Sequence, residues 1–129
     1  MLQPDIDVLF TGQSYSRWQK TFSFMGKDRI RYIQQSQKLL DKRLMVVGED
    51  WEDVGVRAKT QGLATWEMDG LNRRAKVVLA VDALQLHGFT SPRTFNAMLS
   101  GAFVLIAHFP GIEHLFRNGT HLVLSLIHI

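Results

Sequence analysis

Short apolar runs alternate with amphipathic or polar segments along the chain, and most runs end at glycine or a polar residue. Runs of this kind are typical of buried strands. We expect strands in segments 7–11, 44–48, 76–81, 103–107 and 121–125. Helical spacing of apolar residues predicts helices or helical turns in segments 27–42, 71–75, 92–100 and 112–117.

This alternation predicts the fold class. Strands joined through helices, by connections too long for hairpins, indicate an α/β fold: a Rossmann-like parallel sheet with helices on both faces. Ligands of such sheets bind beyond the carboxyl ends of the strands. The loops that leave those ends here are 12–17, 48–51 and 82–93. No repeat or linker interrupts the sequence, so residues 1–129 are expected to form a single domain.

The helix expected at 92–100 carries the clearest local signal. Ser91 can cap it, Pro92 fits its first position, and Gly101 can end it. The positive end of a helix attracts anions, and Arg93 adds a planar set of donors beside it. A phosphate-bearing ligand is therefore the first hypothesis. The alternative is that Arg93 is a solvated surface residue paired with a carboxylate.

Two of the expected helices have an apolar side. In segment 92–100 that side holds Phe95, Met98 and Leu99, and we expect it to lie on the sheet. Segment 27–42 divides into an apolar and a basic side. The basic residues are Lys27, Arg31, Lys38 and Lys42. We interpret this basic side as a solvated helix face and not as a nucleic-acid-binding stripe.

Composition narrows the class of protein. A hydrophobic content of 46% with three tryptophans and eight phenylalanines favours a folded chain over a disordered one. The lack of cysteine excludes disulfides and fits a reducing compartment. No apolar run approaches the roughly 18 residues of a membrane span, so we expect a cytoplasmic location. The net charge of +3 permits a phosphorylated partner without requiring one.

Three segments share a pattern with a known family. They are 72–81, 87–103 and 111–119, and the second contains Ser91-Pro-Arg-Thr-Phe-Asn-Ala-Met-Leu-Ser-Gly-Ala102. They resemble the C-terminal, nucleotide-sugar-binding half of GT-B glycosyltransferases of group 1, in the spore-maturation glycosyltransferase-like branch. That branch has Ser-x-Arg-x-Phe-Glu-Ala-x-x-x-Gly-Ala in the central motif. Segments 7–12 and 44–48 resemble the opening strands of the same half.

The resemblance implies a donor, a partner and a set of site residues. The donor is a nucleotide-diphosphate sugar, held without a metal or other cofactor between this half and an N-terminal, acceptor-binding half that is expected to be missing. The resemblance and the loop positions assign donor binding to Gly12, Gln13, Ser14, Arg17, Ser91, Arg93, Thr94, Phe95, Asn96 and Glu113. Arg93 is also expected to act in catalysis. His87, in the loop before its helix, is the histidine best placed for chemistry.

Each of these assignments has a structural alternative. Gly12 can be an ordinary turn glycine, Asn96 can face solvent, and Glu113 can serve its helix dipole. The Asp5-Ile-Asp7 pair is like a metal-binding Asp-x-Asp motif, but it precedes the first strand instead of following it. The histidines lack metal-ligand spacing.

The sequence departs from the family pattern at two positions. Asn96 stands where a glutamate is usual, which replaces a charge-assisted hydrogen bond of about 1.5–3 kcal/mol by a neutral one of about 0.5–1.5 kcal/mol. Gly88 stands where an acidic residue is expected. A weaker or unusual donor therefore stays open, as does a non-catalytic nucleotide- or phosphate-binding module. A receiver-type signalling domain is disfavoured because Asp82 lacks a supporting acidic cluster.

The last residues carry a separate signal. Ser125-Leu-Ile-His-Ile129 resembles a translated sequencing adapter of the kind found at the ends of metagenomic reading frames. We expect residues 125–129 to be artefactual. The last helix expected of this half-domain is also missing, so we interpret the chain as a fragment truncated at its C-terminus.

Overall fold

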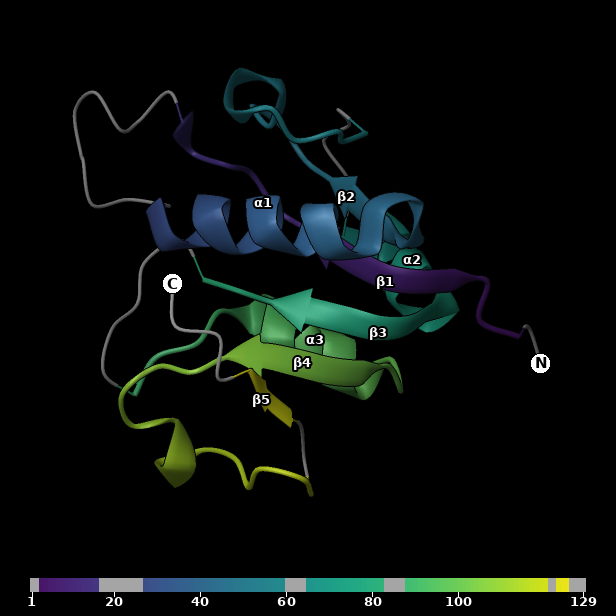
Figure 1. Ribbon diagram of the computed structural model, residues 1–129. Helices are drawn as coiled ribbons and strands as arrows, with labels where there is room; N and C mark the ends of the chain where they lie inside the picture. Colours follow the sequence, from purple (N-terminus) through teal and green to yellow (C-terminus); the bar gives the residue numbers. More distant parts are fainter. Residues whose placement is uncertain (1–2, 17–26, 60–64, 83–87, 121–122, 126–129) are drawn as a thin grey trace.

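The chain forms a single open sheet with helices on both faces (Figure 1). The computed structural model describes residues 3–16, 27–59, 65–82, 88–120 and 123–125. The strands are β1 (Ile6–Thr11), β2 (Leu44–Val47), β3 (Ala75–Ala80), β4 (Phe103–Ala107) and β5 (Val123–Ser125). The helices are α1 (Lys27–Leu40), α2 (Thr65–Arg74) and α3 (Pro92–Leu99), with 3₁₀ turns η2 (Asp41–Arg43), η3 (Glu52–Val54) and η4 (Ile112–His114). The predicted α/β fold is confirmed.

Every strand pairing in the sheet is parallel, in the order β2-β1-β3-β4-β5. The chain runs from β1 through α1 to β2 on one side, and then returns to place β3 on the other side of β1. This reversal opens a crevice at the carboxyl ends of β1 and β3, where open α/β sheets bind ligands. An isolated parallel bridge between Val47 and Lys59 adds one further pairing outside β2.

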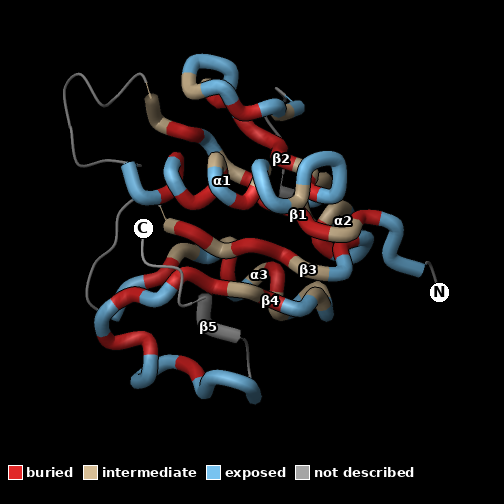
Figure 2. The backbone as a smooth tube through the Cα atoms, in the orientation of Figure 1, coloured by how far each residue is buried: buried red, intermediate tan, exposed pale blue. Residues whose placement is uncertain are grey.

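Buried residues concentrate in the strands and in the segments that cover them (Figure 2), and they form two cores, one on each face of the sheet. On the face covered by α1, Ile30, Tyr32 and Ile33 pack with residues of β1 and β2 such as Phe10 and Val46. The core of the opposite face contains Leu9, Val78, Ala97, Val104, Ile106, Phe109, Ile112 and Phe116. Helices α2 and α3 lie on this second face (Figure 1). Apolar burial on both faces explains why the strands read as continuous apolar runs.

The predicted orientation of α3 is wrong. Its sheet-facing residues include Thr94 and Ala97, which are 1% exposed, whereas Phe95 is 44% and Leu99 86% exposed. The small side chain of Ala97 lets the helix approach the sheet closely, and Met98 is partly buried beside it. Close packing of a small residue therefore decided the orientation, and the larger apolar residues were left outside.

Several element boundaries also differ from the prediction. The helical turn expected at 112–117 is the shorter 3₁₀ turn η4, Ile112–His114. Helix α2 begins at Thr65, whereas the prediction began it at Leu71. The prediction missed this first part because its residues, which end at Gly70, show little apolar periodicity. Helix α1 ends at Leu40 and continues as the 3₁₀ turn η2. Among the described residues, no helix is both long and apolar enough to cross a membrane.

Candidate functional site

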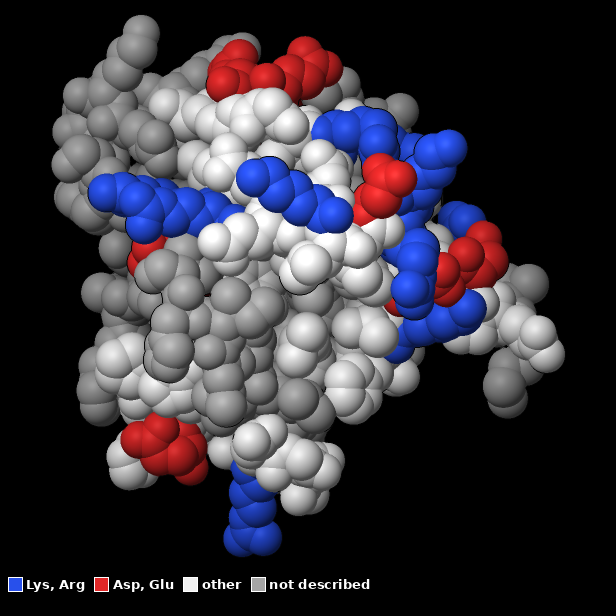
Figure 3. All heavy atoms as spheres, viewed as in Figure 1, with Lys and Arg blue, Asp and Glu red and all other residues white. Residues whose placement is uncertain are grey.

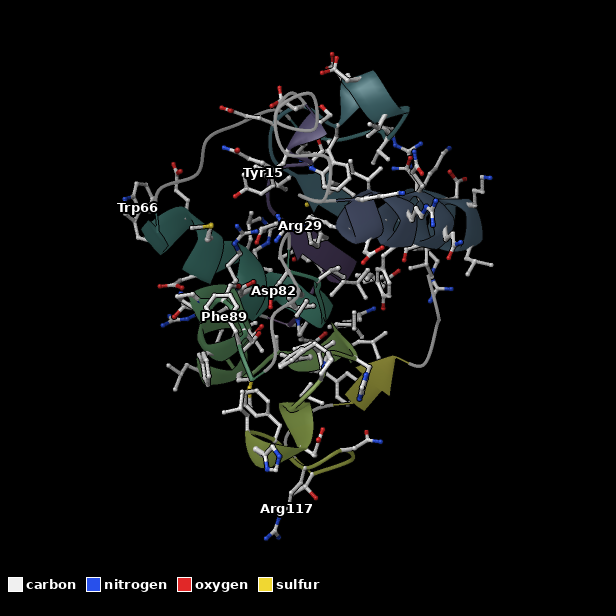
Figure 4. All side chains as sticks on the ribbon, turned by 90° about the vertical axis from the view of Figure 1, so that its left-hand side faces the viewer. Tyr15, Arg29, Trp66, Asp82, Phe89 and Arg117 are labelled. Atoms are coloured by element: carbon white, nitrogen blue, oxygen red, sulfur yellow. The ribbon has the colours of Figure 1, made fainter. Side chains whose placement is uncertain are left out.

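Polar side chains gather in the crevice between the carboxyl ends of β1 and β3 (Figure 4). They surround a cavity of about 20 Å³, which has room for about one water molecule. The polar residues of its lining are Thr11, Arg29, Asn72, Asp82, Ser91, Arg93 and Thr94. Because the cavity is this small, a larger ligand would lie over its mouth and only reach into it.

Arg93 projects from the first turn of α3 toward the end of β1. Its Nη1 donates a hydrogen bond of 2.8 Å to the carbonyl oxygen of Thr11. Ser91 is the N-cap residue of the helix, and Pro92 follows it, as predicted, but the Ser91 hydroxyl makes no capping hydrogen bond within the described part of the chain. No other hydrogen bond of Arg93 is found in the described part of the chain.

Arg29 is a second arginine of the crevice, and the structure buries it to 2% exposure. It comes from the first turn of α1. Its Nε donates to the carbonyl oxygen of Val81 (2.8 Å), and its Nη1 donates to that of Gln13 (3.0 Å). The guanidinium lies 5.5 Å from the ring centroids of Phe10 and Tyr15. Arg29 therefore joins the end of β3 to the loop that follows β1.

The two arginines repel each other. Burial, and after it the charge of Arg93, lowers the pKa of Arg29 to about 10. Tyr15 and Asp82 raise the pKa of Arg29 and so offset part of this lowering. Figure 4 shows Arg29 between these two residues. Within the described ranges, no carboxylate lies within 4.0 Å of either guanidinium. With a pKa of about 10, Arg29 remains charged at neutral pH, so the crevice attracts anions.

Gly12 makes room for both arginines. A β-carbon at this position would collide with Nη1 of Arg93 and would lie 3.2 Å from Nη1 of Arg29. Its φ of 151° lies in the region that favours glycine. The Gly12 N–H donates to Val47 (2.9 Å), and its carbonyl accepts from the buried indole of Trp51 (2.7 Å). Hydrogen bonds therefore hold both the N–H and the carbonyl of Gly12 in place.

Asn72 reaches the same cavity from α2. The residue is 5% exposed, and its Oδ1 has no hydrogen-bond partner in the described part of the chain. A buried acceptor of this kind costs free energy unless a water or ligand donates to it. Across the cavity, the carboxylate of Asp82 accepts long bonds of 3.3 Å from the Ser91 N–H.

The structure brings only some of the predicted site residues together. Gly12, Ser91, Arg93 and Thr94 meet at the crevice. Gln13 contributes its carbonyl oxygen, to which Arg29 donates.

The other predicted residues have different surroundings. Ser14 is buried and donates to the carbonyl oxygen of Asp50 (2.6 Å). Phe95 packs on Phe116, with ring centroids 5.5 Å apart. Asn96 is half-buried on α3 and, like the exposed Glu113 of η4, does not line the cavity. Arg17 and His87 lie outside the described residues.

Sequence reasoning missed Arg29, Asn72 and Asp82 as residues of the crevice. One signal was present for Arg29: it stands four positions before Ile33, so both lie on the same side of the helix. An arginine on the buried side of a helix needs polar partners. No comparable signal marks Asn72, because its neighbours in space are distant in sequence. Asp82 begins loop 82–93, which the sequence placed at the carboxyl end of a strand where ligands bind, but it was not singled out as a site residue.

The fold and the crevice define an open α/β domain with a cationic site at its topological switch point. The model of a family described as glycosyl transferase-like matches residues 29–126. The chain belongs to this family, which confirms the glycosyltransferase resemblance. No curated protein matches the sequence.

Solved structures share the fold. Anabaena Alr3699/HepE in complex with UDP-glucose has a TM-score of 0.62 and 16% identity, over 94% of this chain and 35% of that one. The same protein in complex with UDP and glucose has a TM-score of 0.59 and 15% identity, over 92% and 34%. The chain therefore spans about a third of the length of these structures.

Proposed function

We propose that this chain is the donor-binding, C-terminal half of a GT-B glycosyltransferase, and that its crevice binds the diphosphate of a nucleotide-diphosphate sugar. The observation that carries the proposal is the pair Arg29 and Arg93, two neighbouring guanidiniums without a carboxylate within 4.0 Å in the described part of the chain. A diphosphate would supply the missing negative charge. The UDP-glucose bound by HepE, which shares this fold, supports the choice of ligand.

The proposed mechanism is electrostatic. When the bond between the sugar and the diphosphate breaks, negative charge grows on the leaving phosphate oxygens. The donors of Arg93 and the N-terminus of α3 point to the same crevice and would stabilise that charge. The buried Arg29, which also lines the cavity, would add its positive charge. We assign the acceptor site and any general base to the missing half, and no metal to this one.

The remaining predicted residues complete the proposal. Gln13 and Ser14 follow β1 directly, and we place them along the diphosphate together with Arg17. Phe95 and Glu113 lie farther from the crevice, where they would contact outer parts of the donor. We place Asn96 near the ribose or sugar, and His87 near the substrate.

A non-catalytic nucleotide-binding module is the second candidate. The observation that favours it is Asn96, which stands where the family pattern has a glutamate. Both candidates predict binding of a nucleotide diphosphate at the crevice. They differ in turnover: transfer or hydrolysis of a sugar nucleotide by a longer protein containing this chain would support the transferase, and binding without turnover would support the module.

Replacing Arg93 tests the shared part of the proposal. In Arg93→Ala, we expect the affinities for UDP and for pyrophosphate to fall about tenfold or more, because one charge-assisted hydrogen bond is lost. Calorimetric titration of the purified chain measures both ligands. Arg31→Ala is the matched control, since it removes an exposed arginine of α1 and should leave both affinities unchanged. Equal affinities in Arg93→Ala and the parent protein would contradict the proposed site.

A further inference from the structure

A second groove lies at the outer edge of β2, on the side of the strand away from β1. Its volume is about 320 Å³, within the range of ligand-binding pockets. Three cationic side chains, Lys42, Arg57 and Lys59, stand around apolar residues that include Leu44, Met45 and Ala58. Lys42 precedes β2, so the groove begins at the amino end of the strand. The crevice of the proposed donor site lies at the opposite, carboxyl ends of the strands.

The backbone of β2 is only partly paired along this edge. The N–H of Lys59 donates to the carbonyl of Val46 (2.9 Å), and the N–H of Gly48 donates to the carbonyl of Lys59 (3.0 Å). The N–H and C=O of Val46 therefore point outward, and so does the C=O of Leu44 two residues earlier. Among the described residues, the N–H of Val46 and the C=O of Leu44 have no partner.

Gln37 keeps this part of the edge open. Arg57 would be the next residue to pair with β2, but its N–H donates to Oε1 of Gln37 (3.1 Å) and its carbonyl accepts from Nε2 of Gln37 (3.0 Å). The amide of Gln37 thus satisfies both backbone groups of Arg57 from α1. One donor and one acceptor of β2 are left facing the groove, although Val46 is 2% exposed. An unpaired buried N–H is costly, and a ligand would relieve the cost.

Charge determines what kind of strand fits this edge. Arg57 has Asp41 at 3.6 Å, but Lys42 and Lys59 have no acidic partner in the described part of the chain. Lys and Arg side chains gather with a few acidic ones at the amino ends of the strands, near the N-terminus (Figure 3). A second copy of this chain would bring the same cations against each other, so these charges oppose self-pairing of the edge. An acidic strand has the complementary charge.

We propose that the outer edge of β2 binds an extended acidic peptide segment by strand addition. One residue of the peptide donates its N–H to the Leu44 carbonyl and accepts from the Val46 N–H. Its acidic side chains pair with Lys42, Arg57 and Lys59, and its apolar side chains cover the half-buried Met45. The groove is independent of the proposed donor site, so this interaction does not depend on nucleotide binding.

A fluorescent peptide of eight residues, with Glu and Val alternating, tests the proposal by fluorescence polarisation with the purified chain. We expect saturable binding that UDP does not displace. Lys42→Glu should weaken it at least about fivefold, because reversal turns attraction into repulsion. Lys38→Glu is the matched control: it makes the same charge change on exposed α1, outside the groove, and should bind nearly as well as the parent.

Two further measurements separate strand addition from simple charge attraction. The same peptide with every backbone amide N-methylated should lose binding, because it cannot donate to the Leu44 carbonyl. Gln37→Leu should also weaken binding, since it frees the backbone of Arg57 to pair with β2 and close the groove without changing any charge. Equal losses in Lys42→Glu and Lys38→Glu, full binding of the methylated peptide, or unchanged binding by Gln37→Leu would overturn the proposal.

Discussion

At the residue scale, the crevice depends on a close approach of like charges. Arg29 and Arg93 both donate to main-chain carbonyls at the ends of β1 and β3, and Gly12 lies between them. Main-chain carbonyls compensate only part of the cost of burying a guanidinium. The lowered pKa of Arg29 reflects this cost. The two guanidiniums therefore repel each other, and a bound anion would lower this repulsion.

Gly12→Ala tests this arrangement. The added β-carbon would collide with Nη1 of Arg93, and the φ of 151° is unfavourable for alanine. We expect Arg93 to be displaced, binding of UDP to be lost, and stability to fall by about 1–3 kcal/mol. Urea unfolding and calorimetry measure the two effects. Gly55→Ala is a suitable control, because it also has a positive φ but no atom within 4 Å of the added carbon. Unaltered UDP affinity in Gly12→Ala would show that Arg93 does not need this space.

At the scale of the element, α3 shows why an apolar residue in a helix is not always a core residue. Its sequence offers several apolar side chains, of which the small Ala97 lies against the sheet and Met98 is partly buried beside it. The larger Phe95 and Leu99 lie outside, where Phe95 contacts Phe116. Helix propensity and capping did predict the location of the helix, which begins after Ser91 as expected.

The orientation of α3 predicts that substitutions at two nearby positions change stability by very different amounts. Ala97→Leu should destabilise the protein by about 1–3 kcal/mol, because the site on the sheet has no room for a larger side chain. Leu99→Ala removes a larger group but should change stability by no more than about 0.5 kcal/mol, since the side chain is exposed. Urea denaturation of both variants measures the difference. A larger loss in Leu99→Ala than in Ala97→Leu would mean that the helix is turned the other way.

At the scale of the whole molecule, one sheet separates two apolar cores. Ile33 belongs to the core under α1, and Ile106 to the core of the opposite face. The same strands supply side chains to both cores, alternating from face to face. Loss of packing on either face therefore weakens strands that the other face also needs, so we expect the two cores to unfold together.

Matched truncations test this coupling. Ile33→Ala and Ile106→Ala should each lower the free energy of unfolding by about 2–5 kcal/mol, because both side chains are buried in well-packed cores. Each variant should unfold in one transition, with the same midpoint by tryptophan fluorescence and by far-ultraviolet circular dichroism. Separate midpoints for the two signals would show that the faces unfold independently.

The sequence by itself determined the elements, the fold class and part of the site. Apolar runs predicted the strands, and Ser91, Pro92 and Gly12 marked boundaries, because burial, capping and turn formation are local requirements. The order of the strands, the orientation of α3 and the meeting of Arg29, Asn72 and Asp82 at one crevice were decided only by the tertiary structure. These features depend on packing and on charge interactions between residues far apart in sequence, and no local pattern records such contacts.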